Sequence, residues 1–402
     1  MSELDQYRKE TTEELENILS WWMRMTIDYE NGGFYGKIDH ANKVFSQTAK
    51  GAVLNSRILW TFSSAYNLTE ERKYLDTAGR AFRYISDHFF DKEFGGVYWT
   101  VNFKGEPLNT KKQIYALAFA VYGLSEYYLA SRDKSAQELA NQLYDSIVTH
   151  SYDSKYGGYI EALTRDWNQM GDLRLSDKDA NEKKSMNTHL HLLEAFTSLY
   201  RITPNEQLRN RVVELIRIFL DRIIDPRTNH LYLFFDDQWQ VRSNVISYGH
   251  DIEAAWLLQV AAETISKNSL REDVSGISVK IAEAAIEGLD SDGGLWYEYN
   301  QKGNELFTQK HSWPQAEAMV GWFNAWQISG DSDFLKKSLS SWQFVKDYII
   351  DQELGEWYWG VNANHSPMLA EEKVGIWKCP YHNSRACMEI IRRVENTLSK
   401  KT

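Results

Sequence analysis

Three histidines give the first indication of chemistry in this chain, and they lie far apart in the sequence. His191, His250 and His382 are three of only ten histidines among 402 residues. An imidazole gains or loses a proton near neutral pH, so it can act as a general base or a general acid. A single histidine on a helix is more often structural than catalytic, so the interpretation depends on whether the three occupy equivalent places in the fold.

Other polar and aromatic residues stand, like the histidines, close to where a helix is expected to begin. Arg57 offers a cation that would need an anionic partner if it is buried. Glu253 follows His250 by three residues, which puts both on one helix face, where the carboxylate can orient the imidazole or bind a hydroxyl. The candidate binding residues are Tyr115, Asn187, Glu253, Trp313, Trp377 and Trp296.

Several of these candidates also have a structural interpretation. Arg57 and Asn187 could cap helices, and the tryptophans could belong to the core. His189 lies two residues before His191 and faces another side of the helix, so we expect it to be structural. His311 precedes a helix and is left out of the candidate site.

We expect neither a metal nor a cofactor. Three imidazoles can form a catalytic zinc site. The sequence, however, has no His-x-x-x-His pair, and the three candidate histidines come from separate segments. The pattern of a glycine-rich phosphate loop is also missing, so no nicotinamide or flavin is indicated.

A short glycine–aromatic segment recurs six times along the chain. Equivalent residues at 33, 96, 158, 231, 294 and 357 are separated by steps of 63, 62, 73, 63 and 63 residues. The fourth and sixth copies are degenerate, and an aspartate stands a few residues ahead of each copy. Because glycine tolerates positive φ, each segment predicts a tight turn or a short hairpin.

The stretches between these turns have helical patterns of two kinds. A helix with mixed polar and apolar faces precedes each turn, as in 70–89 and 207–223, which is typical of half-exposed outer helices. A second helix, richer in Ala, Leu, Phe and Trp, follows the turn, as in 113–129 and 252–262. Six such pairs predict an all-α (α/α)6 barrel, closed as a twelve-helix ring in a single domain over 1–402, because the terminal repeats do not resemble the caps of an open solenoid.

In such a ring, the start of each inner helix is where chemistry is expected. Tyr115, His250 and Trp313 each fall 19 residues after their turn. The N-terminal ends of the inner helices would converge on one mouth, where helix dipoles favour anions and lower a histidine pKa. The longest step between turns indicates an inserted loop over 166–184, either a mobile flap over the mouth or a solvated surface loop.

Composition narrows the classes of ligand and location. Aromatic residues make up 14% of the chain, and aromatic surfaces in a pocket suit the apolar faces of sugar rings. A net charge of −11 argues against nucleic-acid binding, and no apolar run approaches the roughly 20 residues of a membrane span. The acidic start has no signal-peptide pattern, and Cys379 and Cys387 form no disulfide framework. We therefore expect a cytoplasmic monomer.

Five motifs connect the chain with a known family. They are SRILW at 56–60, MNTHLH at 186–191, SYGHDIEA at 247–254, QAEA at 315–318 and WKCPYHN at 377–383. Together they resemble the cellobiose 2-epimerase branch of the N-acylglucosamine 2-epimerase family across the whole chain. The resemblance implies the (α/α)6 barrel and an isomerase that interconverts glucose and mannose configurations at the reducing end of β-1,4-linked disaccharides such as cellobiose and lactose.

Inversion at C2 needs two acid–base groups on opposite sides of one carbon. The C2 proton becomes acidic only when the sugar ring is open, and its removal leaves an enediolate that needs hydrogen-bond donors or cations. The resemblance assigns the acid–base pair to His250 and His382, help in ring opening to His191 and stabilisation of the enediolate to Arg57. It also implies that hydroxyls are held by Tyr115, Asn187 and Glu253, and that the sugar stacks on Trp313 and Trp377.

Other functions remain open at this stage. A mannose 2-epimerase or an aldose–ketose isomerase on free hexoses would use the same chemistry. The segment 311–315 also departs from the cellobiose 2-epimerase branch, because it has one tryptophan where those epimerases often have two, which leaves the exact sugar open. A glycoside hydrolase would need two carboxylates, for which Glu253 and Glu317 could be offered, but it leaves the histidines unexplained. A non-catalytic helical scaffold has no use for three histidines and an arginine in one mouth.

Overall fold

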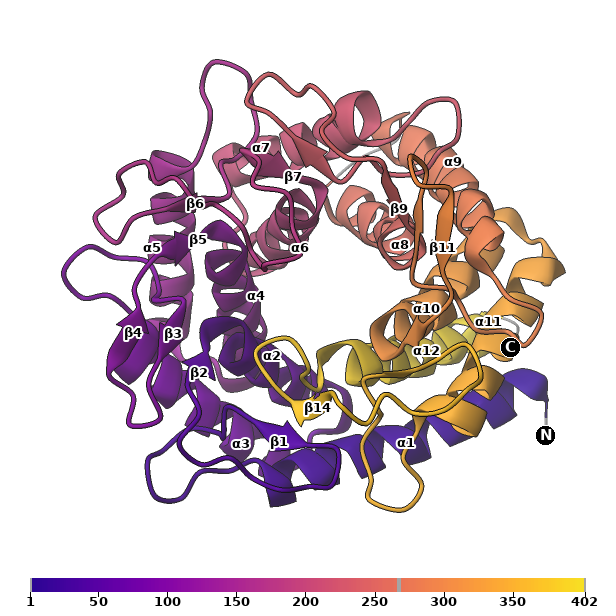
Figure 1. Ribbon diagram of the computed structural model, residues 1–402, viewed down its shortest axis with the longest axis horizontal. Coiled ribbons are helices and arrows are strands. Elements are labelled where there is room, and N and C mark those ends of the chain that lie inside the picture. The colour runs from indigo at the N-terminus through magenta and orange to yellow at the C-terminus, as the bar shows by residue number, and fades with distance from the viewer. Residues whose placement is uncertain (1, 266–268, 401–402) are drawn as a thin grey trace.

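Six pairs of antiparallel helices form a closed ring (Figure 1), as predicted from the repeat. The computed structural model describes residues 2–265 and 269–400. The inner helices are α2 (Ala52–Thr69), α4 (Ile114–Ser131), α6 (Met186–Ile202), α8 (Tyr248–Ile265), α10 (Ser312–Ser329) and α12 (Tyr381–Ser399). The outer helices are α1 (Glu3–Met25), α3 (Arg72–Tyr84), α5 (Lys134–His150), α7 (Glu206–Ile218), α9 (Ser269–Ala284) and α11 (Ser332–Phe344). The expectation of an all-α (α/α)6 barrel is confirmed.

The two kinds of helix differ in how much of their surface is buried. Outer helix α3 buries one stripe that includes Tyr74, Ala78 and Phe82, which are spaced by four residues. Inner helix α4 is buried continuously from Ile114 to Tyr127, because it packs against other helices on all sides. A helix that is apolar all round can only be stable inside the molecule, so the composition of α4 marks it as an inner helix.

Four of the six outer helices, α3, α7, α9 and α11, end in a tightened or widened turn just before a glycine–aromatic segment. These turns are η1 (Ile85–Phe89), η2 (Phe219–Ile223), η3 (Ala285–Gly288) and η4 (Val345–Ile349). In the first repeat, Gly33 has a φ of +61°, and a Cβ there would lie 2.7 Å from Cγ of Tyr84. Backbone bridges such as Ile27 with Phe34 close the turn, so the predicted short hairpin is confirmed.

Short antiparallel ladders join each repeat to the next at one end of the ring. They are β2 (Lys50–Gly51) with β3 (Thr100–Val101) and β4 (Pro107–Asn109), β5 (Lys112–Gln113) with β6 (Ala162–Leu163), β7 (Lys184–Ser185) with β8 (Phe234–Phe235), β9 (Val245–Ser247) with β10 (Glu298–Asn300) and β11 (Glu305–Phe307), and β12 (Lys310–His311) with β13 (Gly360–Val361). The last ladder pairs β14 (Glu372–Val374) of the sixth repeat with β1 (Ile38–Asp39) of the first, which closes the circle.

The recurring aspartates form buried ion pairs with lysines that precede the inner helices. The pairs are Lys50–Asp28, Lys112–Asp91, Lys184–Asp153, Lys310–Asp290 and Lys373–Asp351, with N–O distances between 2.6 and 2.8 Å. In the fourth repeat Asp225 pairs with Arg227 instead. Each aspartate–lysine pair ties a turn to the segment that leads into the following inner helix, which helps to set where that helix begins.

The inserted loop between β6 and β7 is fastened to the mouth. Lys111 Nζ donates to the carbonyl of Arg174 at 2.9 Å, and Gln113 Nε2 donates to the carbonyl of Leu173 at 3.3 Å. Leu173 itself is only 4% exposed. The loop is therefore neither a free surface loop nor detached from the site: it packs beside the start of α4.

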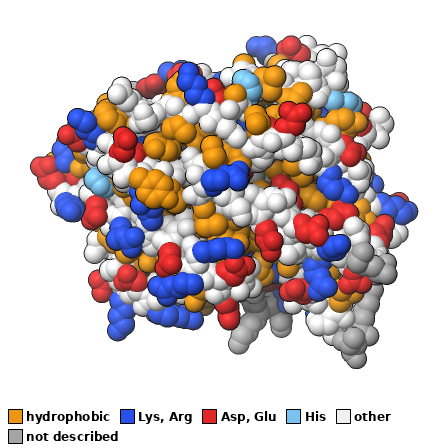
Figure 2. All heavy atoms as spheres, turned by 90° about the horizontal axis from the view of Figure 1, so that it is seen from below, with side chains coloured by type: hydrophobic (Ala, Val, Ile, Leu, Met, Phe, Trp, Pro, Cys, Tyr) orange, Lys and Arg blue, Asp and Glu red, His pale blue; other side chains and the backbone are white. Residues whose placement is uncertain are grey.

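Side chains of both charges are found on the outside of the ring. Figure 2 shows basic and acidic side chains interspersed over the side of the molecule. No helix among the described residues is both long enough and apolar enough to cross a membrane.

Candidate active site

Two of the candidate histidines face one tryptophan at the mouth. Trp313, in the first turn of α10, has its ring 4.7 Å from that of His250 on α8 and 5.7 Å from that of His382 on α12. All three are within the first turn of an inner helix. The fold thus brings together side chains that are separated by up to 132 residues in the sequence.

The two imidazoles are held through the same nitrogen by different partners. Nδ1 of His382 lies 2.7 Å from Oε1 of Glu317, and Nδ1 of His250 lies 2.8 Å from the hydroxyl of Ser247. Burial lowers the pKa of His250 to about 3, and burial together with Arg57 and Arg385 holds the pKa of His382 well below its ordinary value. Both rings are therefore neutral at neutral pH, the form that can accept a proton.

His191 lies deeper, with its ring edge against Tyr115. The centroids are 5.0 Å apart at an interplanar angle of 87°, and the ring of Phe119 is 4.6 Å away. Nδ1 lies 3.0 Å from Oε2 of Glu194. Burial lowers the pKa of His191, while Glu194 opposes the shift.

Arg57 is a buried cation without a carboxylate partner within the described residues. Its Nη2 donates to Tyr115 Oη at 2.9 Å, its Nη1 lies 3.4 Å from the carbonyl of Trp377, and its guanidinium lies 4.2 Å from the ring centre of Phe119. The residue is only 3% exposed. Burying a cation without a counter-charge is costly, so this side chain is set to receive an anion at the mouth.

Behind the histidines lies a charged network that the sequence interpretation missed. Nη2 of Arg385 is 2.6 Å from Oε1 of both Glu253 and Glu317, and its Nη1 is 2.5 Å from Oε1 of Glu194. The guanidinium also donates to Tyr381 Oη. Burial, followed by the charge of Glu317, raises the pKa of Glu253 to about 8. One arginine thus holds the carboxylates that in turn contact His191 and His382.

The network corrects the expected role of Glu253. The sequence suggested that Glu253 could orient His250, its neighbour three residues earlier. Instead, the histidine near it is His382, with Nδ1 4.0 Å from Oε1 of Glu253, and its closer partner is Arg385. Glu317, four residues after Trp313 on α10, is only 1% exposed and so lies deeper than the mouth.

A simple spacing could have revealed this network. Each candidate histidine is followed three residues later, one turn deeper on the same helix face, by a charged residue. The pairs are His191 with Glu194, His250 with Glu253 and His382 with Arg385. Only the middle pair was used in the sequence interpretation.

The remaining candidate residues, Trp377, Asn187 and Trp296, are placed differently around the histidines and Arg57. Trp377 lies against Trp99 and Tyr115, with centroid separations of 5.7 and 6.0 Å. Asn187 is half-buried beneath the inserted loop, and its Oδ1 has no hydrogen-bond partner in the described structure. Trp296 is not brought into the cluster: its indole N–H donates to Asp290 at 3.2 Å, beside the Asp290–Lys310 ion pair.

His189 and His311, two histidines that were not included in the candidate site, each make defined contacts. His189 Nε2 accepts from the backbone N–H of Tyr159 at 3.0 Å, and its Nδ1 lies 2.7 Å from the carbonyl of Ser185, so the expected structural role is confirmed. His311 is the N-cap residue of α10 and stacks on Tyr297 with centroids 3.9 Å apart.

One group of side chains has the composition of a metal site. Ligand atoms of Glu253, Glu317 and His382 all lie within 4.8 Å of one another. The guanidinium of Arg385, however, already lies 2.6 Å from an oxygen of each carboxylate. A divalent cation would have to displace this buried arginine, so the donor set does not fit a metal well.

The ring of helices and the histidines at its mouth define a class of carbohydrate epimerases. The sequence profile of the N-acylglucosamine 2-epimerase (GlcNAc 2-epimerase) family matches residues 33–386, and the chain belongs to this family. It is 49% identical to a cellobiose 2-epimerase of Bacteroides fragilis, over 93% of this chain and 95% of that protein. It is 40% identical to one of Ruminococcus albus, over 97% and 98%. The resemblance inferred from the five motifs is confirmed.

Solved structures give the same result for the fold. The structure of cellobiose 2-epimerase from Bacillus thermoamylovorans B4167 is 38% identical, with a TM-score of 0.93 over 97% of this chain and all of that chain. A D-mannose isomerase structure reaches a TM-score of 0.85 at 22% identity, which shows a shared fold alone.

Proposed function

We propose that this protein is a 2-epimerase that converts the reducing-end glucose of β-1,4-linked disaccharides such as cellobiose and lactose to mannose. The observation that carries the proposal is the placement of both His250 and His382 beside Trp313, with ring centroids 4.7 and 5.7 Å from it. Two neutral imidazoles beside one flat surface can reach the two faces of a sugar carbon stacked there. The identity to cellobiose 2-epimerases over nearly the full chain supports the same substrate class.

In the proposed mechanism, His191 assists opening of the sugar ring, which exposes a carbonyl at C1. One histidine of the pair then removes the C2 proton, and the electrons of the C–H bond form the enediolate. Arg57, a buried cation without a carboxylate partner within the described residues, would stabilise its charge. The other histidine protonates C2 from the opposite face. Glu317 would stabilise the imidazolium of His382 whenever that ring holds the extra proton.

Binding roles follow from the same geometry. Trp313 and Trp377 would stack on the sugar, and Tyr115 and Asn187 would hold hydroxyls or the open-chain oxygen. The unpartnered Oδ1 of Asn187 supports such a role. Glu253 is proposed to act through Arg385 and His382 rather than on the substrate, because its carboxylate is already engaged.

The deciding experiment follows chelator-treated protein with cellobiose in heavy water by NMR. Glucosyl-mannose carrying deuterium at C2 is the expected product. A ketose-ended disaccharide would instead identify an aldose–ketose isomerase, and turnover of mannose alone would move the substrate to free hexoses.

Release of glucose from cellobiose would identify a hydrolase. The geometry does not favour that outcome, because Glu253 and Glu317 share one nitrogen of Arg385 and so do not flank an open substrate position.

We also propose a cytoplasmic, monomeric, cofactor-independent enzyme that is one domain over 1–402. The free and buried state of both Cys379 and Cys387 supports a reducing compartment. The net charge of −11 and the interspersed charges of Figure 2 support a protein that does not bind nucleic acid.

A further inference from the structure

An open chamber of about 1070 Å³ lies at the end of the ring opposite the histidines. We call it the rear chamber. Its wall is made mainly by the middle and the C-terminal halves of the inner helices, with Trp60 midway along α2, Tyr122 midway along α4 and Asn324 in the second half of α10. The three candidate histidines stand in the first halves of their helices and do not line it. The rear chamber is therefore separate from the candidate histidines.

The rear chamber has a surplus of positive charge in an acidic protein. Seven basic side chains and four carboxylates line it, whereas the chain as a whole carries −11. Arg392 and Arg393 are half-buried in its wall, where both form ion pairs with the single carboxylate of Glu389. Arg201 is exposed at its rim, and its guanidinium has no ion-pair partner in the described part of the chain. Arginine is well suited to bind phosphate or carboxylate groups.

Four buried polar atoms of the lining residues have no hydrogen-bond partner in the described structure. They are Trp60 Nε1, Thr197 Oγ1, Asn324 Nδ2 and Arg385 Nε. Each of the four residues is at most 4% exposed. An unsatisfied buried donor costs about 1–3 kcal/mol, so native proteins rarely leave several of them together. All four atoms can donate and are covered in the described structure, so a ligand rich in acceptor oxygens would satisfy those that its binding uncovers.

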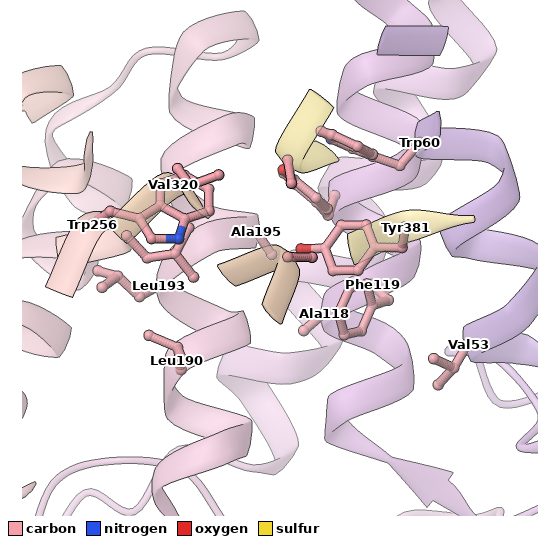
Figure 3. Packing of buried hydrophobic residues seen from close by; sticks show 14 of the residues in the cluster. Val53, Trp60, Ala118, Phe119, Leu190, Leu193, Ala195, Trp256, Val320 and Tyr381 are labelled. Atoms are coloured by element: carbon pink, nitrogen blue, oxygen red, sulfur yellow. The ribbon is translucent and has the colours of Figure 1, made fainter. Parts of the chain in front are cut away.

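Aromatic surfaces complete the lining. The rings of Trp60 and Tyr122 are stacked, with centroids 5.1 Å apart and an interplanar angle of 15°. Figure 3 shows Trp60 and Trp256 on two sides of the interior of the ring. Aromatic faces among polar donors are typical of sites for sugar rings.

We propose that the rear chamber is a second binding site, specific for a sugar phosphate. The arginines bind the phosphate, and the unpartnered donors and aromatic faces bind the sugar. Arg385 and Glu194 form the wall between the two ends of the ring, because both line the chamber and both belong to the network behind the histidines. An occupant of the chamber would thus contact the side chains that position His191 and His382.

The test is a calorimetric titration of the full chain with glucose 1-phosphate. This probe has a blocked anomeric carbon, so it cannot open its ring at the histidines. One molecule is expected to bind per chain, while methyl α-glucoside, its neutral counterpart, gives no binding. Arg201→Ala should weaken binding about tenfold, as expected for loss of a charge-assisted contact. Trp60→Phe, which removes one unpartnered N–H, should weaken it about threefold.

Arg222→Ala is the matched control, because Arg222 is exposed in η2 on the outside of the ring. It should leave binding unchanged. The proposal is overturned if wild-type protein does not bind glucose 1-phosphate, or if Arg57→Lys abolishes binding while Arg201→Ala does not. Equal affinity for inorganic phosphate and glucose 1-phosphate would overturn the assignment of a sugar phosphate. None of these readings depends on epimerase activity.

Discussion

The residues at the mouth differ in their hydrogen-bond partners, and this difference predicts their roles. His382 has an anionic partner in Glu317, whereas His250 has the hydroxyl of Ser247. Among the described residues, the partners of Arg57 are a phenol, a carbonyl, the sulfur of Cys379 and aromatic faces, and none is a carboxylate. The sequence could identify these three side chains because of their type and register. The spacing of three residues after His382 also marks Arg385, but the carboxylates that it binds lie up to 191 residues away and could not be identified from that spacing.

Replacing Arg57 by lysine tests the role of its planar guanidinium. Lysine keeps the charge but cannot donate to Tyr115 and the mouth in the same geometry. Because the enediolate exists only after proton removal, kcat should fall about 100-fold with little change in KM. Steady-state kinetics with cellobiose measure this. A large rise in KM with an unchanged kcat would assign Arg57 to ground-state binding instead.

The buried histidines predict how stability depends on pH. The pKa of His250 is about 6.5 in the unfolded chain and about 3 in the fold, so on acidification the unfolded state takes up its proton first. Stability is therefore lost as pH falls through this window. Thermal melts from pH 7 to 4 should show a shallower loss for His250→Asn than for wild type. Identical slopes would contradict a neutral, buried His250.

Individual elements are placed by the turns and by the ion pairs that follow them. The six-fold repeat predicted the helices, their order and the turns, because glycine and aromatic residues mark each turn in the sequence. The lysine partners of the repeated aspartates were not predicted. They stand two residues before the inner helix in most repeats, but Lys373 stands eight residues before α12, so no constant spacing reveals them.

Gly33 tests how tightly a turn is packed. In Gly33→Ala the new Cβ would lie 2.7 Å from Tyr84, in addition to the strain of a φ of +61°. Gly330 is the control, since it has a φ of +76° and nothing within 4 Å of an added Cβ. Both changes should cost about 1–2 kcal/mol in backbone strain, and Gly33→Ala should cost clearly more. Equal losses of unfolding free energy in denaturant would contradict the close packing of this turn.

The molecule as a whole depends on the seam where the last repeat meets the first. There α1 packs against α12, and β1 pairs with β14. Four indole N–H groups cross the seam: Trp21 donates to Leu354, Trp22 to Glu356, Trp342 to Glu10 and Trp357 to Glu14. Closure was predicted from the sequence, but these contacts span more than 330 residues and could not be.

Trp357→Phe tests this seam. The substitution keeps a buried aromatic ring but removes the 2.7 Å hydrogen bond to Glu14, a residue that is 6% exposed. The free energy of unfolding should fall by about 1–3 kcal/mol. Trp326→Phe, at a half-buried tryptophan that packs on Phe323, is the control and should cost less. A smaller effect for Trp357→Phe than for the control would show that the seam does not depend on this bond.

The central claim is that His250 and His382 serve opposite faces of one carbon, and hydrogen exchange at C2 tests it most directly. His250→Asn and His382→Asn are each incubated in heavy water with cellobiose and, separately, with glucosyl-mannose. Neither variant should interconvert the two sugars. One variant should still exchange the C2 hydrogen of the glucose form only, and the other that of the mannose form only. Near wild-type epimerisation by either folded variant, or exchange of the same sugar by both, would contradict the two-histidine mechanism.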